Sequence, residues 1–450
     1  MWKKLLITGC VTFSLLSGGT LSAQPSCEIK EEVTSEQLDR TQKELVAMMK
    51  ELKNDSYFQT ELDKAAVQSS LSKRMAAYKD LTVRLLSVLE IQAELEWMKP
   101  EAIQEALGIM KKSSGFDAVL ADKRFGELKS LLAGGFDGIY TGDAQAIDKA
   151  NKTLTLKRKL MLMSPDVNVD KMLTVKFDLG ERANFVGAGS LGIQPNNWSN
   201  LSSASRKNFK AQLVELSGLQ SGELSEKVLY KPAVDGSSVT DLVLNWDGKR
   251  LMFTALDTTR RWQVHELDIN NGEAKQVTNI PEPDLEFFDG TYLPDGRMLA
   301  ISNIGYQGVP CVNGSDAVGN MVLYDPSNGY LRRLTFDQDA NWHPVVMANG
   351  KVMYVRWEYT DLTHYFSRIV MHMNPDGTEQ KSLYGSGSMF PNSIFDVQPL
   401  PKHTNRFVGV ISGHHGVARS GRLMIFDPAK SRKEEKGMIQ ELPFRGRPII

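Results

Sequence analysis

The stretch "DGTYLPDGRMLAISN" (residues 289–303) has the form of a β-strand, a tight turn at Asp295-Gly296 and a second β-strand. The same pattern recurs in "DLVLNWDGKRLMFTAL" (241–256) and "HPVVMANGKVMYVRW" (343–357). Each of the three stretches is followed, after a variable loop, by a further strand pair. An Asp-Gly or Asn-Gly pair between two alternating apolar runs is a strong local signal for a β-hairpin. The chain therefore contains an internal repeat of four short strands.

The spacing of the repeat predicts its architecture. The turn glycines Gly248, Gly296 and Gly350 lie 48 and 54 residues apart, and four strands in about fifty residues is the signature of a β-propeller blade. A further unit covers residues 396–442, and a partial first unit covers residues 172–230. We therefore expect a mainly β fold of four-stranded antiparallel blades with five recognisable units. The sequence leaves open whether the ring is closed or incomplete.

The part of the chain before the repeat has a different period. From Thr34 to about Ser164, leucine and methionine recur at three-, four- and seven-residue spacings, which predicts amphipathic helices. Thr34 and Ser35 are expected to cap the first of them, and Pro100 is expected to open another. We interpret these stripes as the core of an all-α region over residues 24–165, followed by the propeller domain over residues 166–450.

The N-terminus predicts export. Lys3 and Lys4 precede an apolar stretch that ends in small residues near Ala23, as in a secretory signal peptide. We expect cleavage after residues 1–23, a periplasmic or extracellular protein, and no integral membrane segment after cleavage. Cys10 ends a sequence shaped like a lipid-attachment box, but too few apolar residues precede it, so we do not expect a lipoprotein anchor.

Composition and motifs exclude several classes of function. The formal net charge is −1, so no global field favours nucleic acid. The sequence has no CxxCH for covalent c-type haem, no phosphate-binding glycine motif for a nucleotide and no HExxH zinc motif. After cleavage the remaining cysteines are Cys27 and Cys311, which are either a disulfide or two thiols.

The repeat also predicts where function lies. Within each blade, the loop between the second and third strands opens on one face, which we call the mouth. These loops are long for hairpin connections, and long ordered loops on one face usually carry function. Candidate contacts from these loops and the strands beside them are Arg356, Glu358, His364, His414, His415 and Arg419. Arg356 and Glu358, together with Asp361, are equally explained as a salt-bridge network that supports their loop.

The inner strands place a second set of polar residues at the mouth. The residues that open these strands are Asp241, Asp289, His343 and Asp396. Because innermost strands converge on the channel, we expect the four side chains to form a polar ring there. Pro344 should hold His343 in an extended conformation. The ring is a candidate site for a cationic or polyhydroxylated ligand or for a divalent metal, whose candidate ligands are His343, His414 and His415. The alternative is structural, because such aspartates also cap neighbouring turns.

From about residue 155 onward the sequence resembles the bacterial family related to the hydrazine synthase alpha subunit, in its middle propeller domain. The resemblance is carried by "YLPDGRMLAIS", "GVPCVNGSD", "RRLTFDQDANWHPVV", "GKVMYVRWEYTDLTHYFSR", "MHMNPDGT" and "SGHHGVARSGRL". Shorter elements such as "LPDGR" are shared with TolB-type propeller repeats. The resemblance implies an exported propeller. It does not carry the haem chemistry of hydrazine synthase, because the haem-attachment motif is absent.

These observations favour an exported protein that binds a small molecule, a glycan or a protein partner at the mouth. The competing hypothesis is a metal-assisted enzyme that uses the histidines and aspartates of the same mouth for a reaction that the sequence does not identify. A propeller fold hosts many functions, so it does not decide between them.

Overall fold

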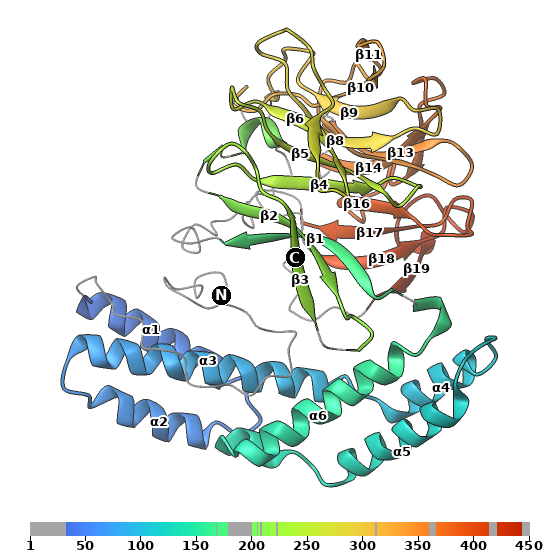
Figure 1. Cartoon of the computed structure of the whole chain (residues 1–450). Coiled ribbons are helices and arrows are strands. Elements are labelled where there is room, and N and C mark those ends of the chain that lie inside the picture. Colours follow the sequence, from blue (N-terminus) through green and yellow to red (C-terminus); the bar gives the residue numbers. More distant parts are fainter. Residues whose placement is uncertain are drawn as a thin grey trace.

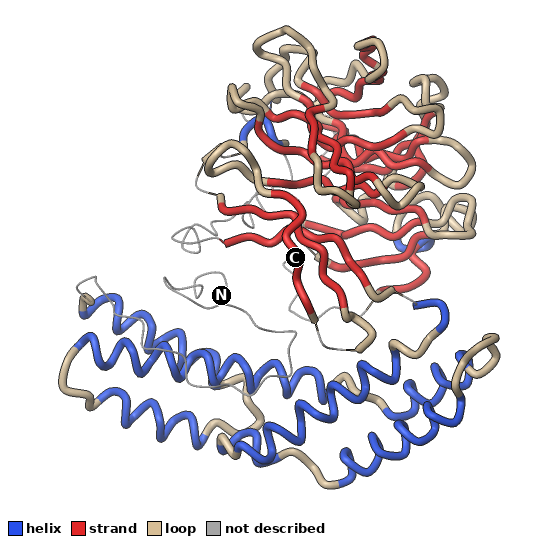
Figure 2. The backbone as a smooth tube through the Cα atoms, viewed as in Figure 1, coloured by secondary structure: helices blue, strands red, loops and turns tan. Residues whose placement is uncertain are grey.

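The computed structural model describes residues 33–167, 169–178, 200–204, 206–207, 209–221, 224–310, 313–359, 366–413 and 421–442. Residues 1–23, for which the sequence predicts a signal peptide, lie outside these residues, as do Cys27 and Cys311. In the described part, a layer of helices is followed in the chain by a stack of antiparallel sheets (Figures 1 and 2). The helices therefore fall in the part of the sequence with helical spacing, and the strands fall in the part with the hairpin repeat.

The helical region contains six α-helices within the described residues. Thr34 caps the first of them: its hydroxyl accepts a hydrogen bond from the Gln37 N–H at 3.2 Å, while the Gln37 side chain accepts from the Thr34 N–H at 3.0 Å. Pro100 opens the fourth helix, as expected. The bounds are α1 (Ser35–Met49), α2 (Ser56–Ala66), α3 (Leu71–Glu96), α4 (Pro100–Met110), α5 (Ala118–Ala133) and α6 (Ala144–Met161).

The predicted leucine and methionine stripes form the core of this region. Leu45, Leu81 and Leu85 are almost completely buried between α1, α2 and α3, and a second cluster lies between α4, α5 and α6. The described residues contain no helix that is both long and apolar enough to cross a membrane.

The repeat forms sheets in which each strand pairs with the next in the chain. The first sheet has three strands, β1 (Lys171–Asp178), β2 (Lys210–Ser217) and β3 (Ser225–Tyr230). The second contains β4 (Val239–Leu244), β5 (Arg250–Leu256), β6 (Trp262–Asp268) and β7 (Ala274–Gln276). The third contains β8 (Phe287–Tyr292), β9 (Met298–Ser302), β10 (Asn320–Asp325) and β11 (Tyr330–Arg333).

Two further sets of four strands complete the described repeat. They are β12 (Asn341–Val346), β13 (Val352–Tyr359), β14 (Phe366–Met373) and β15 (Lys381–Tyr384), then β16 (Ser393–Pro399), β17 (Phe407–Ser412), β18 (Arg422–Phe426) and β19 (Met438–Glu441). A single parallel pair, Arg368 with Ser393, joins the two sets along β14 and β16.

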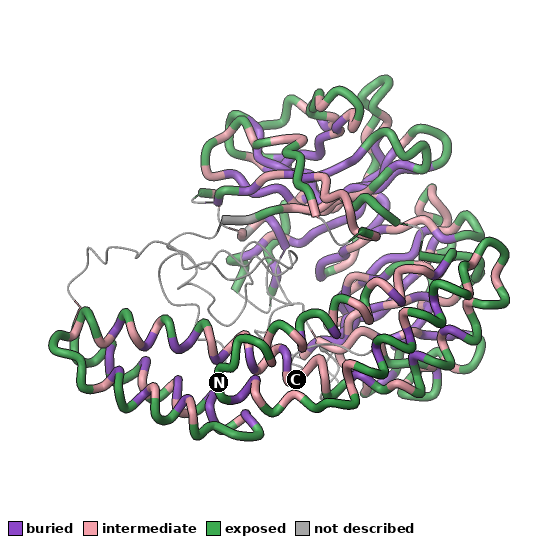
Figure 3. Tube along the Cα trace, turned by 60° about the horizontal axis from the view of Figure 1, so that its bottom comes forward, coloured by how far each residue is buried: buried purple, intermediate pink, exposed green. Residues whose placement is uncertain are grey.

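The faces of neighbouring sheets are buried against one another. Trp342, Trp357 and Phe395 lie in one apolar cluster between the last two sets of strands, and buried residues follow the sheet interiors (Figure 3). The inner strands β4, β8, β12 and β16 contact one another in chain order. This arrangement of radiating antiparallel sheets is that of a β-propeller.

Candidate active cavity at the inner strands

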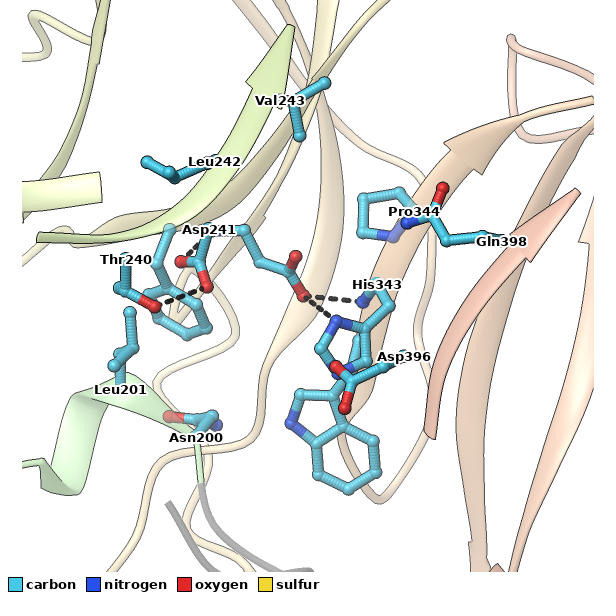
Figure 4. A pocket seen from close by; sticks show the side chains of 13 residues that line it. Asn200, Leu201, Thr240, Asp241, Leu242, Val243, His343, Pro344, Asp396 and Gln398 are labelled. Atoms are coloured by element: carbon cyan, nitrogen blue, oxygen red, sulfur yellow. Dashed lines mark hydrogen bonds and ion pairs between the residues drawn. The ribbon is translucent and has the colours of Figure 1, made fainter. Parts of the chain in front are cut away.

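The four predicted ring residues line one cavity. Asp241, Asp289, His343 and Asp396 come from β4, β8, β12 and β16, and they surround a space of about 210 Å³. Figure 4 shows that Asp241 approaches from one side, while His343 and Asp396 approach from the other. The inner strands thus bring together residues that are up to 155 positions apart (396 − 241).

A β-bulge places each of these residues. The strand pairing skips between Thr240 and Val243, and the same skip occurs at the corresponding point of β8, β12 and β16. The inward residue of every bulge has a left-handed backbone, with φ of 56° at Asp241, 53° at Asp289, 53° at His343 and 50° at Asp396. Aspartate and histidine are among the non-glycine residues that tolerate this region best.

This finding corrects the expected backbone of His343. The residue before a proline is biased toward extended geometry, but His343 lies in the left-handed region although Pro344 follows it. The bulge and a hydrogen bond from the His343 N–H to Asp289 determine the conformation instead.

The ring residues are connected to one another by hydrogen bonds that pass from blade to blade. Asp241 Oδ2 accepts from the Asp289 N–H at 3.0 Å, and Asp289 Oδ2 accepts from the His343 N–H at 2.5 Å. His343 Nε2 lies 3.2 Å from Asp396 Oδ1, and His343 Nδ1 lies 3.6 Å from Asp289 Oδ2. We call this series of contacts the inner relay. Asp241 and Asp289 thus each accept a hydrogen bond from the next inner strand instead of capping a neighbouring turn, and they also line the cavity.

The cavity changes the acidity of one of its carboxyl groups. Burial, reinforced by the negative charge of Asp289, raises the pKa of Asp241 to about 6. Hydrogen bonds from Thr254 and the Asp289 N–H, together with His343, oppose this rise. Asp241 is thus protonated in part near neutral pH.

The raised pKa predicts how Asp241 affects stability. Because the folded protein holds this proton more tightly than the unfolded chain, Asp241 stabilises the fold at acid pH and loses this contribution as the pH rises from about 4 to about 6. We expect Asp241→Asn to remove about 2 kcal/mol of this pH dependence. Urea unfolding of wild type and variant at pH 4.5 and pH 7.5 measures it. Equal pH dependence in the two proteins would contradict the assignment.

Arg356 and Glu358 do not line the cavity. Arg356 Nε lies 2.8 Å from Glu358 Oε1, and Arg356 Nη2 lies 3.1 Å from Asp337 Oδ1. The two residues form a salt bridge with each other, as one explanation from the sequence expected, and Asp337 is a partner that the sequence did not single out. Asp361, the third residue of that explanation, lies outside the described residues. The other loop candidates, His364, His414, His415 and Arg419, lie outside the described residues.

The sequence also missed some residues beside the ring. Thr254 Oγ1 accepts a second hydrogen bond from the Asp289 N–H at 3.2 Å, and Thr240 Oγ1 donates to Asp241 Oδ1 at 3.1 Å. Asn200 and Leu201, which lie within the long β1–β2 connection, line the same cavity. Of these residues, only Thr240 could have been found from the sequence, because it directly precedes the ring residue Asp241.

The described residues do not group into a metal centre. No three histidine, cysteine, aspartate or glutamate side chains in this part of the chain are arranged so that they could hold one ion. Of the three candidate metal ligands, only His343 belongs to the described residues.

Comparisons with known proteins identify similar solved structures. No protein-family model matches the chain, and no curated protein matches it. Hydrazine synthase from Kuenenia stuttgartiensis is 14% identical over 62% of this chain and 39% of its own, with a TM-score of 0.46. TolB from Acinetobacter baumannii is 17% identical over 48% of this chain and 45% of its own, with a TM-score of 0.33.

A putative TolB from Agrobacterium tumefaciens is also 17% identical, over 39% of this chain and 57% of its own, with a TM-score of 0.30. The chain thus spans about half the length, or less, of these proteins. The structures similar to this chain include TolB-like β-propellers and hydrazine synthase.

Proposed function

We propose that this protein is an exported binding protein whose inner cavity holds a small organic cation. The observation that carries the proposal is the cavity itself. It presents the carboxyl groups of Asp241, Asp289 and Asp396, and its described lining contains no lysine or arginine. A cation among them would favour the ionised form of Asp241, whose pKa burial raises.

The remaining walls of the cavity favour an organic ligand. Leu201, Leu242, Val243 and Pro344 lie between the polar groups, and small-molecule sites combine such apolar walls with a few polar groups that fix orientation. A hydrated inorganic ion would leave these apolar surfaces in contact with water. An ammonium carried on methyl or methylene groups satisfies the carboxylates and the apolar walls together.

A pair of matched probes tests the proposal. Choline and its uncharged analogue 3,3-dimethylbutan-1-ol have nearly the same shape, so their difference in affinity reports the charge. We expect choline to bind the purified protein at least about tenfold more tightly, since one charge-assisted contact contributes about 1.5–3 kcal/mol. Titration calorimetry at pH 7.5 measures both. Equal affinities, or no heat with choline, would contradict a cation site.

Two further parts of the proposal rest on the sequence. Export rests on Lys3, Lys4 and the apolar stretch that ends near Ala23, and the mass of the protein recovered from its host tests cleavage at this point. A distant relationship to the middle propeller of the hydrazine synthase alpha subunit rests on the motifs between Asp289 and Arg422.

A further inference from the structure

The inner cavity presents one polar side chain, that of Gln398, which the cation site does not use. Gln398 lies on β16 two positions after Asp396, and both residues line the cavity. The strand pairing skips between Phe395 and Gln398, so the bulge that contains Asp396 ends at Gln398. Two strand residues span about 6–7 Å along the channel. A ligand that contacts Asp396 therefore needs only a short chain to reach Gln398.

The amide of Gln398 is accessible to a ligand. The side chain is exposed, and among the described residues no hydrogen bond engages its amide. Two other neutral polar side chains of the cavity are already engaged within the protein. The Asn200 amide donates one hydrogen bond at 2.6 Å and accepts another at 2.8 Å, and the Thr240 hydroxyl donates to Asp241 at 3.1 Å. Gln398 is thus the better candidate for a neutral contact with the ligand.

Gln398 shares its part of the cavity with apolar side chains. On β4, Val243 likewise lies two positions after the ring aspartate and lines the cavity. In Figure 4 a group of lining residues lies above Asp396, namely Leu242, Val243, Pro344 and Gln398. Within this group only glutamine forms hydrogen bonds through its side chain. The cavity therefore offers carboxyl groups in one part and a single amide between apolar walls in the next.

We propose that Gln398 selects the cation that the cavity binds, and that this cation carries an uncharged hydrogen-bonding group, such as a hydroxyl, a few bonds from its ammonium. The inference rests on the proposed cation site. A primary amide both donates and accepts hydrogen bonds, as a hydroxyl does. A carboxylate at this place would face the three carboxyl groups of the ring, and the described lining contains no lysine or arginine to offset it. Amino alcohols therefore fit the cavity better than amino acids or betaines.

Three quaternary ammonium ions with the same head group test the proposal. Choline carries a hydroxyl, propyltrimethylammonium has a methyl group in its place, and glycine betaine has a carboxylate. Titration calorimetry at pH 7.5 measures their affinities for the full chain. We expect choline to bind about fivefold more tightly than propyltrimethylammonium, because a neutral hydrogen bond makes a modest net contribution. Glycine betaine should bind at least about tenfold more weakly than choline.

Gln398→Met removes the amide and keeps the length of the side chain. In this variant the advantage of choline over propyltrimethylammonium should fall below about twofold, while the affinity for propyltrimethylammonium changes by less than about twofold. Gln440→Met is the matched control. Gln440 is an exposed glutamine on β19, in the same set of four strands as β16, and it does not line the cavity. This control should keep the fivefold preference for choline.

The outcomes separate the role of Gln398 from the cation site. An unchanged preference in Gln398→Met, or an equal loss for choline and propyltrimethylammonium, would overturn the role of Gln398. So would a wild-type protein that does not prefer choline, or one that binds glycine betaine as tightly as choline. In each of these cases a quaternary ammonium still binds, so the cation site stands. No binding of any of the three ions would refute the cation site, and this inference with it.

Discussion

Replacing Asp289 by alanine is expected to lower the free energy of unfolding by about 3 kcal/mol. The Asp289 carboxylate accepts the His343 N–H at 2.5 Å, and a hydrogen bond to a charged group in a half-buried site is among the stronger ones. The substitution also places alanine at a φ of 53°, where a residue without a polar side chain gains no local hydrogen bond. Urea unfolding followed by tryptophan fluorescence measures the change.

Asp295 provides a matched control for this prediction. It lies in the exposed turn of the same sheet, where its carboxylate contacts Arg297 at 2.6 Å, and exposed ion pairs contribute little. Asp295→Ala should therefore remain within about 1 kcal/mol of wild type. Asp289→Asn should lose less than Asp289→Ala, because asparagine keeps an acceptor and tolerates the left-handed region. If Asp289→Ala costs no more than Asp295→Ala, the inner relay does not stabilise the fold.

Most of the strand order follows from the sequence because turns and alternation are local signals. The hairpin at Asp295-Gly296 forms β8 and β9 as expected, and the capped helix after Thr34 forms α1. The sequence pattern did not predict α2 and α5 as separate helices. α2 has only eleven residues, and α5 contains Gly126 and packs only a few buried residues.

The candidate site could be predicted less completely, because it depends on contacts between blades. Alignment of the inner strands placed Asp241, Asp289, His343 and Asp396 together, since equivalent positions of a repeat converge on the channel. The bulge at each of these positions could not be predicted in the same way. A bulge has no fixed local sequence pattern when the inward residue is not glycine, and the pre-proline preference pointed to the wrong backbone at His343.

The inner relay explains why aspartate suits these positions for two reasons at once. A carboxylate in the left-handed bulge reaches the backbone N–H of the next inner strand, which ties neighbouring blades together. The same geometry directs carboxyl groups at the cavity, where burial, reinforced by the negative charge of Asp289, raises the pKa of Asp241 to about 6. In the proposed cation site, the ring residues would serve both stability and ligand recognition, so a test of binding needs a variant outside the relay's backbone bonds.

Asp396→Asn is such a variant, and it is expected to weaken choline binding about thirtyfold, or by about 2 kcal/mol. Asp396 is the most exposed carboxyl group among the ring residues that contact His343, with 37% of its side chain exposed against 16% for Asp289. No described backbone N–H donates to it, so asparagine removes the charge without breaking a backbone hydrogen bond between blades, and its side-chain oxygen can still accept from His343. Asparagine also tolerates the φ of 50° at this position. Titration calorimetry at pH 7.5 measures the loss.

Asp337→Asn is the control that separates direct contact with choline from the effect of a distant charge. Asp337 pairs with Arg356 at 3.1 Å and does not line the cavity, yet its replacement changes the net charge by the same amount. Charge at a distance is screened within about 10 Å at ordinary ionic strength, so Asp337→Asn should change choline affinity less than about threefold. Equal losses in Asp396→Asn and Asp337→Asn would mean that choline binds away from the ring, and the cation site would have to be abandoned.

The affinity of the wild-type protein for choline should also fall as the pH drops through about 6, where Asp241 takes up its proton.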